Sequence, residues 1–372
     1  MSKTVLITGG AGFIGSHLAN ELLDKGYNVK ALDNLSEQVH GKNCIRPDYL
    51  NEEVELIVGD VRDPVKVKEA LKGVDAVYHY AAMVGVGQSM YQIKEYTDVN
   101  NTGTAVLLEA LINNPVEKLV VASSMSIYGE GLYKDKSEKI SPGLERKLDQ
   151  LKTGNWEVMD KNGETLKPYP TPETKNPSLA SVYALSKFDQ EKMCLMIGKA
   201  YNIPTVALRF FNVYGTHQAL SNPYTGVLAI FASRLMNDNA PMIFEDGMQQ
   251  RDFVSVLDIA QASRLALETS AADYEAFNIG SGNAYTVVEI AEKMARVLGK
   301  EHIKADVSGK YRVGDIRHCF ADITKAKEIL NYQPKISLEE GLVELATWLE
   351  GQTAEDKVAE AKNELITRGL TV

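Results

Sequence analysis

Cysteine is scarce in this sequence. Its 372 residues include three cysteines, Cys44, Cys194 and Cys319, which lie far apart and form no C-x-x-C pair. This usage excludes a disulfide framework and a cysteine-based zinc site, and it indicates a reducing compartment such as the cytoplasm. Long apolar runs are also lacking, so we expect neither a membrane span nor a signal peptide.

Positive charge is in deficit as well, because acidic residues outnumber basic ones and the formal net charge is −10. Surfaces that bind nucleic acid are basic, so this charge argues against nucleic acid as a partner. A small anionic ligand held by a few local arginines is still compatible with it. With 44% hydrophobic residues, the chain can bury the core of two domains, or of one large unit with an appended lobe.

Glycines recur at a fixed spacing near the start of the chain. Gly9, Gly12 and Gly15 follow the apolar segment 5–7 and precede a helical pattern. Glycines at these positions let the backbone turn off a strand and approach a diphosphate, which the N–H groups of the following helix can bind. A glycine triplet can also be a turn that binds nothing. Here Asp33 ends the next strand, 18 residues after Gly15, where a carboxylate suits the hydroxyls of an adenosine ribose. Together they favour a dinucleotide site.

Segments with strand character alternate with helical patterns through the first half of the sequence. This alternation predicts an α/β fold, a Rossmann-type doubly wound parallel sheet with helices on both faces. The expected strands span residues 5–7, 29–32, 54–58, 76–80, 119–122 and 205–209.

The alternation ends near residue 215, which predicts a change of domain. We expect a dinucleotide-binding domain over residues 1–215, a smaller C-terminal α/β substrate lobe mainly over 216–350, and a charged, loosely held tail over 351–372. In the lobe, Thr286-x-x-Glu289 and Ser337-x-x-Glu340 each predict the start of a helix.

One segment of the first domain, residues 130–177, has a different composition. It is polar, it carries mixed charge, and it holds five of the twelve prolines. We expect a surface insertion with one short helix near 144–151 and with Trp156 as its packing anchor. Regular structure resumes with a helix over about 179–201.

That helix contains Tyr183 and Lys187, which are about one turn apart and therefore project from the same face. A nearby ammonium stabilises a phenolate and lowers its pKa. Such a tyrosine can take the proton of a hydroxyl while the carbon loses a hydride to a nicotinamide. The same spacing also occurs on solvated helix faces. The Ser123-Ser124 pair at the end of strand 119–122 and the glycine loop favour the catalytic interpretation.

The motifs, taken together, resemble the extended short-chain dehydrogenase/reductases and, within them, the NAD-dependent nucleotide-sugar epimerase/dehydratase branch. The resemblance runs in order over residues 4 to about 350. It implies a Rossmann domain with a sugar-nucleotide lobe, tightly bound NAD, and a homodimer formed through a four-helix bundle by the Asn100 and Tyr183 helices. The motifs are Thr8–Gly15, Asp33-Asn34, Gly59-Asp60-Val61, His79-x-Ala81-Ala82, Asn100, Ser123-Ser124, Tyr183-x-x-x-Lys187 and Arg209-Phe210-Phe211-Asn212.

The resemblance implies a role for each matching residue. Tyr183 is expected to be the acid and base, Lys187 to lower its pKa and hold the nicotinamide ribose, and Ser124 to hydrogen-bond the reacting sugar hydroxyl. The remaining NAD contacts are expected from Gly9, Gly12, Phe13, Ile14, Gly15, Asp33, Asn34, Leu35, Asp60, Val61, Tyr80, Ala81, Ala82, Asn100, Ser123 and Phe211. The other substrate contacts are expected from Ser126, Asn212, Arg251, Arg312 and Asp315. Uncharged Asn34 and Leu35 after Asp33 favour NAD over NADP.

Two departures from relatives refine the expected reaction. The 4,6-dehydratases of this branch carry Asp-Glu where this chain has Met125 and Ser126, so dehydration is disfavoured and 4-epimerisation through a transient 4-keto sugar is favoured. The long insertion and the run 220–227 look most like the dTDP-L-rhamnose 4-epimerase type, on a pattern otherwise close to UDP-galactose 4-epimerases. Because the insertion lacks cysteine, we expect no metal.

Alternatives to a 4-epimerase are a nucleotide-sugar dehydrogenase or reductase that releases its keto product, and an NAD-binding regulatory protein. Intact Ser124, Tyr183 and Lys187 argue against the regulatory protein. The insertion follows the Ser124 loop, so we expect residues 132–174 to border the sugar site and influence substrate choice without touching NAD. A surface decoration or a dimer contact is the alternative.

Overall fold

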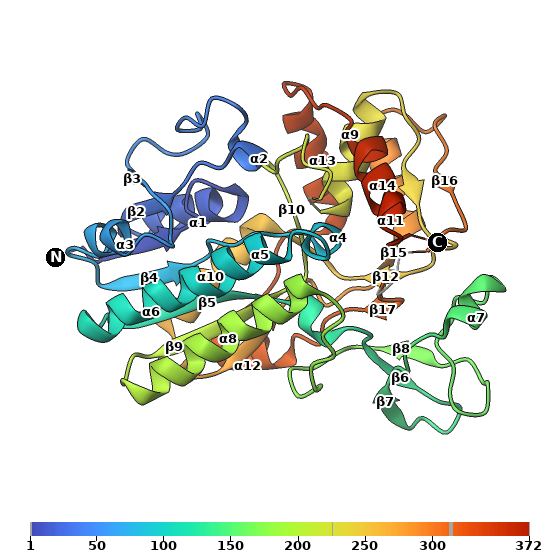
Figure 1. The fold of residues 1–372 in the computed structure, drawn as a ribbon, viewed down its shortest axis with the longest axis horizontal. Helices are drawn as coiled ribbons and strands as arrows, with labels where there is room; N and C mark the ends of the chain where they lie inside the picture. The colour runs from blue at the N-terminus through green and yellow to red at the C-terminus, as the bar shows by residue number, and fades with distance from the viewer. Residues whose placement is uncertain (1, 225, 312–314, 372) are drawn as a thin grey trace.

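The computed structural model describes residues 2–224, 226–311 and 315–371. The larger of its two lobes is built on a seven-stranded parallel sheet with the order β14-β9-β5-β4-β1-β2-β3 (Figure 1). The strands are β1 (Thr4–Thr8), β2 (Asn28–Asp33), β3 (Glu55–Val58), β4 (Ala76–His79), β5 (Lys118–Ser124), β9 (Thr205–Phe210) and β14 (Ala276–Ile279). The chain proceeds outward from β1 to β3 and then returns to β4 on the other side of β1. The crevice at the carboxyl ends of β1 and β4 is therefore where such a sheet binds ligands.

Helices cover both faces of this sheet, as the sequence predicts, and the predicted fold class is confirmed. Val5 and Ile7 of β1 pack into the core beneath α1 (Phe13–Asp24) and α10 (Val256–Glu268). Leu6 points the other way, into the core beneath three more helices. These are α3 (Pro64–Ala70), α6 (Gly103–Asn113) and α8 (Val182–Ala200).

The sheet also takes a strand from beyond the predicted domain boundary. β14 pairs with β9, and α10 and α12 (Thr324–Leu330) pack on the same lobe. Residues after 215 therefore contribute to both lobes. The four residues of β14 give too short a pattern to be separated from a loop by periodicity.

The smaller lobe packs α9 (Val227–Met236), α11 (Val287–Val297) and α13 (Leu338–Leu349) around its own apolar core. Both predicted capping boxes are present, at the starts of α11 and α13. Short strand pairs complete the lobe and connect it to the sheet. They are β10 (Asn212–Tyr214) with β13 (Phe253–Ser255), β11 (Met242–Ile243) with β16 (Asp306–Val307), and β12 (Gln250–Arg251) with β15 (Tyr285–Thr286) and β17 (His318–Cys319).

The insertion is more regular than the sequence suggests. It forms an antiparallel sheet of β6 (Leu132–Lys134), β7 (Ile140–Pro142) and β8 (Lys167–Tyr169), and α7 (Leu148–Lys152) lies in the chain between β7 and β8 (Figure 1). Tyr133, Val158 and Leu166 form its core. Trp156 is not in that core, because its ring packs against Tyr311 of the lobe, with centroids 6.0 Å apart. Strands of three residues are too short for their alternation to be recognised.

The tail contains a helix, α14 (Val358–Thr367), that contacts residues 87–91 of the larger lobe, and the residues before it are held on the smaller lobe, where Asp356 pairs with Arg234 at 3.2 Å. The Arg368 guanidinium lies over the Tyr91 ring, 4.4 Å from its centroid, and Leu365 lies against Gly87. Shorter helical turns are α2 (Glu37–His40), α4 (Val86–Ser89), α5 (Ile93–Tyr96), the π-turn η1 (Thr97–Thr102), and the 3-10 turns η2 (Met125–Tyr128) and η3 (Ser270–Ala272). Among residues 2–224, 226–311 and 315–371, no helix combines the length and apolarity needed to cross a membrane.

Candidate functional site

The glycine loop joins β1 to α1 with no room for side chains. A Cβ on Gly9, whose φ is +73°, would lie 2.9 Å from the Ala81 nitrogen, and one on Gly15 would lie 2.3 Å from the Gly9 carbonyl oxygen. Gly12 is the N-cap of α1 and has no side chain to cap the helix. The first N–H groups of α1, those of Phe13 and Ile14, are therefore not covered by a capping side chain. This cradle fits a dinucleotide diphosphate.

Asp33 is fixed beside this loop at the end of β2. Its carboxylate accepts hydrogen bonds from the Ala11 nitrogen at 3.1 Å and the Leu35 nitrogen at 3.0 Å. Asn34 donates to Asp60 at 3.1 Å, and Arg62 forms an ion pair with the same carboxylate at 2.8 Å. Hydrogen bonds from Arg62 lower the pKa of Asp60 to about 2. The structure thus brings Asp33, Asn34, Leu35 and Asp60 together.

Asn100 shapes the chain that follows β4. Its amide is fully buried, accepts from the Met83 nitrogen at 2.7 Å, and donates to the Met83 carbonyl and to Ser186. It therefore holds the segment of half-buried Ala81 and Ala82 in place, while Val61 is buried against Gly103. The Tyr80 side chain, by contrast, points toward α10, where its phenol donates to Ser263 at 2.6 Å.

Three serines at the carboxyl end of β5 and just after it have different partners. Ser123 donates to the buried carboxylate of Glu191 at 2.7 Å, so its hydroxyl is committed to the core. Ser124 hydrogen-bonds to the phenol of Tyr183. The buried Ser126 hydroxyl has no hydrogen-bond partner among the described residues.

Tyr183 differs electrostatically from the sequence-based expectation. Burial raises the pKa of its phenol, and the hydrogen bond from Ser124 acts in the opposite direction. The Lys187 ammonium instead donates to the Ala122 carbonyl at 2.8 Å and to Gln190 at 3.0 Å. Burial lowers the pKa of Lys187 to about 8. In this structure Ser124 lowers the pKa of Tyr183, and the expected effect of Lys187 on that pKa stays a prediction.

The other predicted substrate residues come from separate segments: Ser126 follows β5 and Asn212 follows β9, whereas Arg251 lies in β12 and Asp315 precedes β17. The Oδ1 atom of Asn212 is buried and has no partner within the described part of the chain, and Phe211 is buried next to it. Arg251 donates to the carbonyls of Arg317, at 2.9 Å, and Ile316. Asp315 begins that same segment, whereas Arg312 lies outside the described residues.

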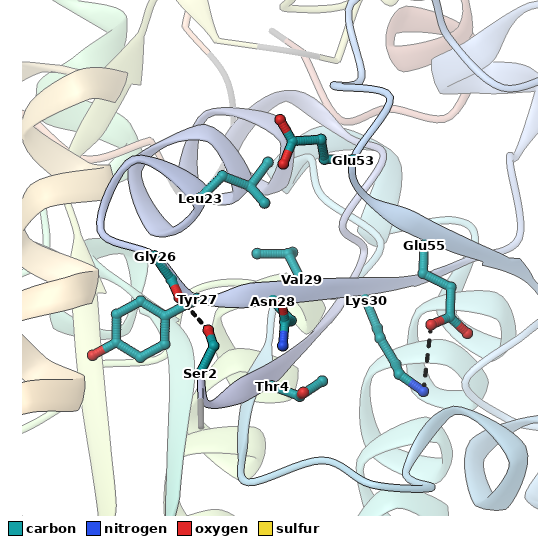
Figure 2. A pocket seen from close by; sticks show the side chains of 10 residues that line it. All are labelled: Ser2, Thr4, Leu23, Gly26, Tyr27, Asn28, Val29, Lys30, Glu53 and Glu55. Atoms are coloured by element: carbon teal, nitrogen blue, oxygen red, sulfur yellow. Dashed lines mark hydrogen bonds and ion pairs between the residues drawn. The ribbon is translucent and has the colours of Figure 1, made fainter.

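Of two cavities in the structure, one lies away from the candidate site and the other adjoins the glycine loop. The one in Figure 2, of about 630 Å³, lies at the amino ends of β1, β2 and β3, where Thr4, Asn28 and Glu55 begin these strands, so it is outside the candidate site. A larger one, of about 1240 Å³, lies between α2, residues 217–224 and the chain after α13. One of its lining residues, Tyr49, donates to the Ala11 carbonyl at 3.0 Å, so it adjoins the glycine loop. Within the described ranges, no group of three acidic, histidine or cysteine side chains is arranged to hold a metal ion.

Sequence reasoning missed residues that support the site from beneath. Gln190 contacts Lys187 and, through its amide nitrogen, Thr104 and the His79 ring at 2.9 and 3.2 Å. The sequence did contain one indication of this contact: Lys187 and Gln190 are three residues apart, which places both on one helix face. The acidic partners of Arg317, described below, come from distant segments and had no local signal.

Comparisons with known proteins agree with this geometry. Residues 5–147 and 157–280 match the NAD dependent epimerase/dehydratase family. The chain is 34% identical to the dTDP-L-rhamnose 4-epimerase of Burkholderia thailandensis, over 93% of this chain and 95% of that protein. It is similar to the UDP-glucose 4-epimerase of Thermotoga maritima with UDP-glucose (TM-score 0.75, 31% identity, covering 93% and 98% of the two chains). It is also similar to the Thermus thermophilus UDP-glucose 4-epimerase complexed with NAD (TM-score 0.74, 30% identity, 94% and 100%).

Proposed function

The chain belongs to the NAD dependent epimerase/dehydratase family, and we propose that it is a nucleotide-sugar 4-epimerase acting on dTDP-L-rhamnose or a related nucleotide hexose. The observation that carries the proposal is the position of Ser124 at the carboxyl end of β5, where its side chain lowers the pKa of the Tyr183 phenol. This pair stands where an open parallel sheet binds its ligands. It can also bind and deprotonate a hydroxyl group.

Tyr183 removes the proton from the sugar 4-hydroxyl and later returns it to the same oxygen. Ser124 hydrogen-bonds that hydroxyl and favours the phenolate, against the burial that raises the pKa of Tyr183. Because one proton leaves and comes back, no second acid or base is required. This agrees with Met125 and Ser126 in the two positions after Ser124, since neither exchanges protons usefully near neutral pH.

The glycine cradle, Asp33 and Lys187 are the residues that would hold NAD. Bound NAD supplies a reversible hydride acceptor beside the sugar. The Lys187 ammonium is anchored by the Ala122 carbonyl and Gln190, so it presents a fixed charge to the nicotinamide ribose. Asn34 and Leu35, which follow Asp33, offer no positive charge for a 2′-phosphate.

The unpartnered atoms of Ser126 and Asn212 support a polar ligand on the other side of the reacting pair. A buried hydroxyl or amide oxygen without a partner is destabilising unless a ligand or water satisfies it. These two atoms lie on the segments that follow β5 and β9 and are suited to the sugar and its diphosphate. The 4-keto sugar must then rotate in the pocket so that the hydride returns to its other face.

The test uses purified full-length protein. Denatured protein is assayed for released NAD, and native protein is incubated with dTDP-, UDP- and GDP-sugars, with products identified by NMR. We expect bound NAD and interconversion of two 4-epimers. Accumulation of a keto sugar with NADH would identify a dehydrogenase instead. Bound NAD without turnover of any sugar would favour the regulatory protein.

We also propose a homodimer through α6 and α8. These helices pack side by side on one face of the sheet (Figure 1), and Met196 of α8 is 63% exposed and Leu185 46% exposed. Large apolar side chains exposed on one helix suit burial against a second copy. Sedimentation of wild type and Met196→Glu tests this, with a dimer expected to weaken in the variant; an unchanged dimer would place the interface elsewhere.

A further inference from the structure

The insertion is joined to the smaller lobe by a buried cluster of charged side chains. We call this set the insertion cluster. Three members come from the insertion and three from lobe segments far away in sequence. They are Glu130, Arg146 and Glu157, and Glu245, Asp246 and Arg317.

Arg146 makes the central connection from the insertion. Its guanidinium pairs with Glu245 at 2.8 Å and donates to the backbone carbonyl of Asp315 at 2.9 Å. It also donates to the Trp156 carbonyl at 3.1 Å, and Glu130 lies 3.6 Å away. One insertion side chain therefore holds both the loop after β11 and the segment that leads into β17.

Glu130 holds the same segment at its next residues. Its carboxylate accepts from the backbone nitrogens of Arg317 at 2.6 Å and His318 at 3.2 Å. From the lobe, Arg251 donates to the carbonyls of Arg317 and Ile316. Residues 315–318 are thus clamped through their backbone between two insertion side chains and Arg251.

The centre of the cluster is too buried to be an incidental surface contact, although Glu157 and Asp246 at its edge are 35% and 38% exposed. The side chains of Arg317 and Glu245 are 0% exposed and that of Arg146 is 5% exposed. Burying charges costs desolvation energy, and well-packed apolar groups usually stabilise a fold as well or better. The insertion already has its own apolar core in Tyr133, Val158 and Leu166. A charged network of this kind fixes the position of the insertion relative to the lobe segments that it contacts.

We propose that Glu130 and Arg146 are positioning residues that fix segment 315–318 and, through it, Arg251, the arginine that we expect to bind the diphosphate of the nucleotide sugar. The inference rests on the proposed function, because it names how that site holds its substrate. In this proposal the insertion contributes to substrate binding indirectly, because it fixes a segment of the smaller lobe. No direct contact between the insertion and the sugar is needed.

The test compares Arg146→Met with Lys136→Met. Lys136 pairs with Glu164 within the insertion and, among the described residues, forms no ion pair with a member of the cluster. Its replacement is therefore the matched loss of one positive charge. Binding of UDP and dTDP to each full-length holoenzyme is measured by calorimetry. Hydrogen exchange of amides 315–322 is measured without nucleotide. Arg146→Lys and Glu130→Gln serve as milder variants in case Arg146→Met folds poorly.

We expect Arg146→Met to speed exchange at residues 317 and 318 and to weaken nucleoside diphosphate binding about tenfold, with bound NAD unchanged. Arg146→Lys should fall between, because one ammonium cannot serve Glu245 and the Asp315 carbonyl together. Faster exchange with unchanged nucleotide affinity would overturn the inference, and so would unchanged exchange. Nucleotide binding that weakens as expected in a protein that epimerises no sugar would leave the inference standing and overturn the proposed function.

Discussion

The ammonium of Lys187 lies 3.0 Å from the side-chain oxygen of Gln190, one turn further along α8. The Gln190 amide nitrogen in turn donates to Thr104 and contacts His79, whose other ring nitrogen lies 2.9 Å from the Thr8 hydroxyl of β1. All five side chains are buried. The proposed catalytic lysine is therefore the end of a polar chain that begins at the strand before the glycine loop.

Replacing Gln190 tests whether this chain tunes Lys187. Gln190→Met removes the acceptor for the ammonium, so the pKa of Lys187 should fall below about 8. In the pH profile of kcat, the fall on the alkaline side should then begin at lower pH, and kcat should be reduced about tenfold. Gln190→Glu should move the limb the other way, because a carboxylate favours the ammonium. A limb that both variants leave in place would show that Gln190 does not tune the lysine.

Tyr183→Phe should remove the proton transfer and leave the fold intact. Loss of a general acid–base group lowers the rate by about 10² to 10⁴, while NAD released on denaturation should be unchanged. Tyr201→Phe, at the exposed residue that follows α8, is the control and should be fully active. Near-normal turnover by Tyr183→Phe would assign the proton transfer to another residue.

Ser124→Ala should shift the pH dependence as well as the rate. The Ser124 hydrogen bond lowers the pKa of Tyr183, so its loss raises that pKa and the basic form of the phenol appears only at higher pH. The rising limb of kcat/KM should move upward in pH. Ser124→Thr keeps the hydroxyl and should restore the wild-type limb. A fall in rate with an unmoved limb in Ser124→Ala would limit Ser124 to binding the sugar.

The sequence predicts those parts of the site that depend on local spacing. The glycine loop spans one strand-to-helix turn, and Tyr183 and Lys187 occupy one helix turn, so their geometry follows from the elements themselves. The direction in which a side chain points could not be predicted from local spacing in the same way. Ser123 sits beside Ser124, yet its hydroxyl is committed to Glu191.

The parts that the sequence could not predict depend on contacts between distant segments. The alternation of strands and helices gave the sheet correctly up to β9, but β14 joins it after α10 and a change of lobe. In the same way, the pairing of Arg146 with Glu245 joins residues 99 positions apart. Each partner taken alone has the sequence character of a surface charge.

His79 gives the last prediction, a dependence of stability on pH. Burial, with Lys187 adding a smaller effect, lowers the pKa of His79 from 6.5 to about 3. Between these values the unfolded chain binds a proton that the folded chain does not, so stability falls as pH falls from 6.5 toward 3. From pH 7 to pH 5 this group should cost about 2 kcal/mol of unfolding free energy.

Urea unfolding of wild type, His79→Gln and His302→Gln at pH 7 and pH 5 measures this cost. His79→Gln should be less stable at pH 7, because it disturbs the hydrogen bonds to Thr8 and Thr104, but it should lose about 2 kcal/mol less than wild type between the two pH values. His302 is exposed, so His302→Gln should show the wild-type loss. An equal loss in wild type and His79→Gln would mean that His79 is protonated in the folded protein at pH 5, and that the buried chain beneath Lys187 tolerates a second positive charge.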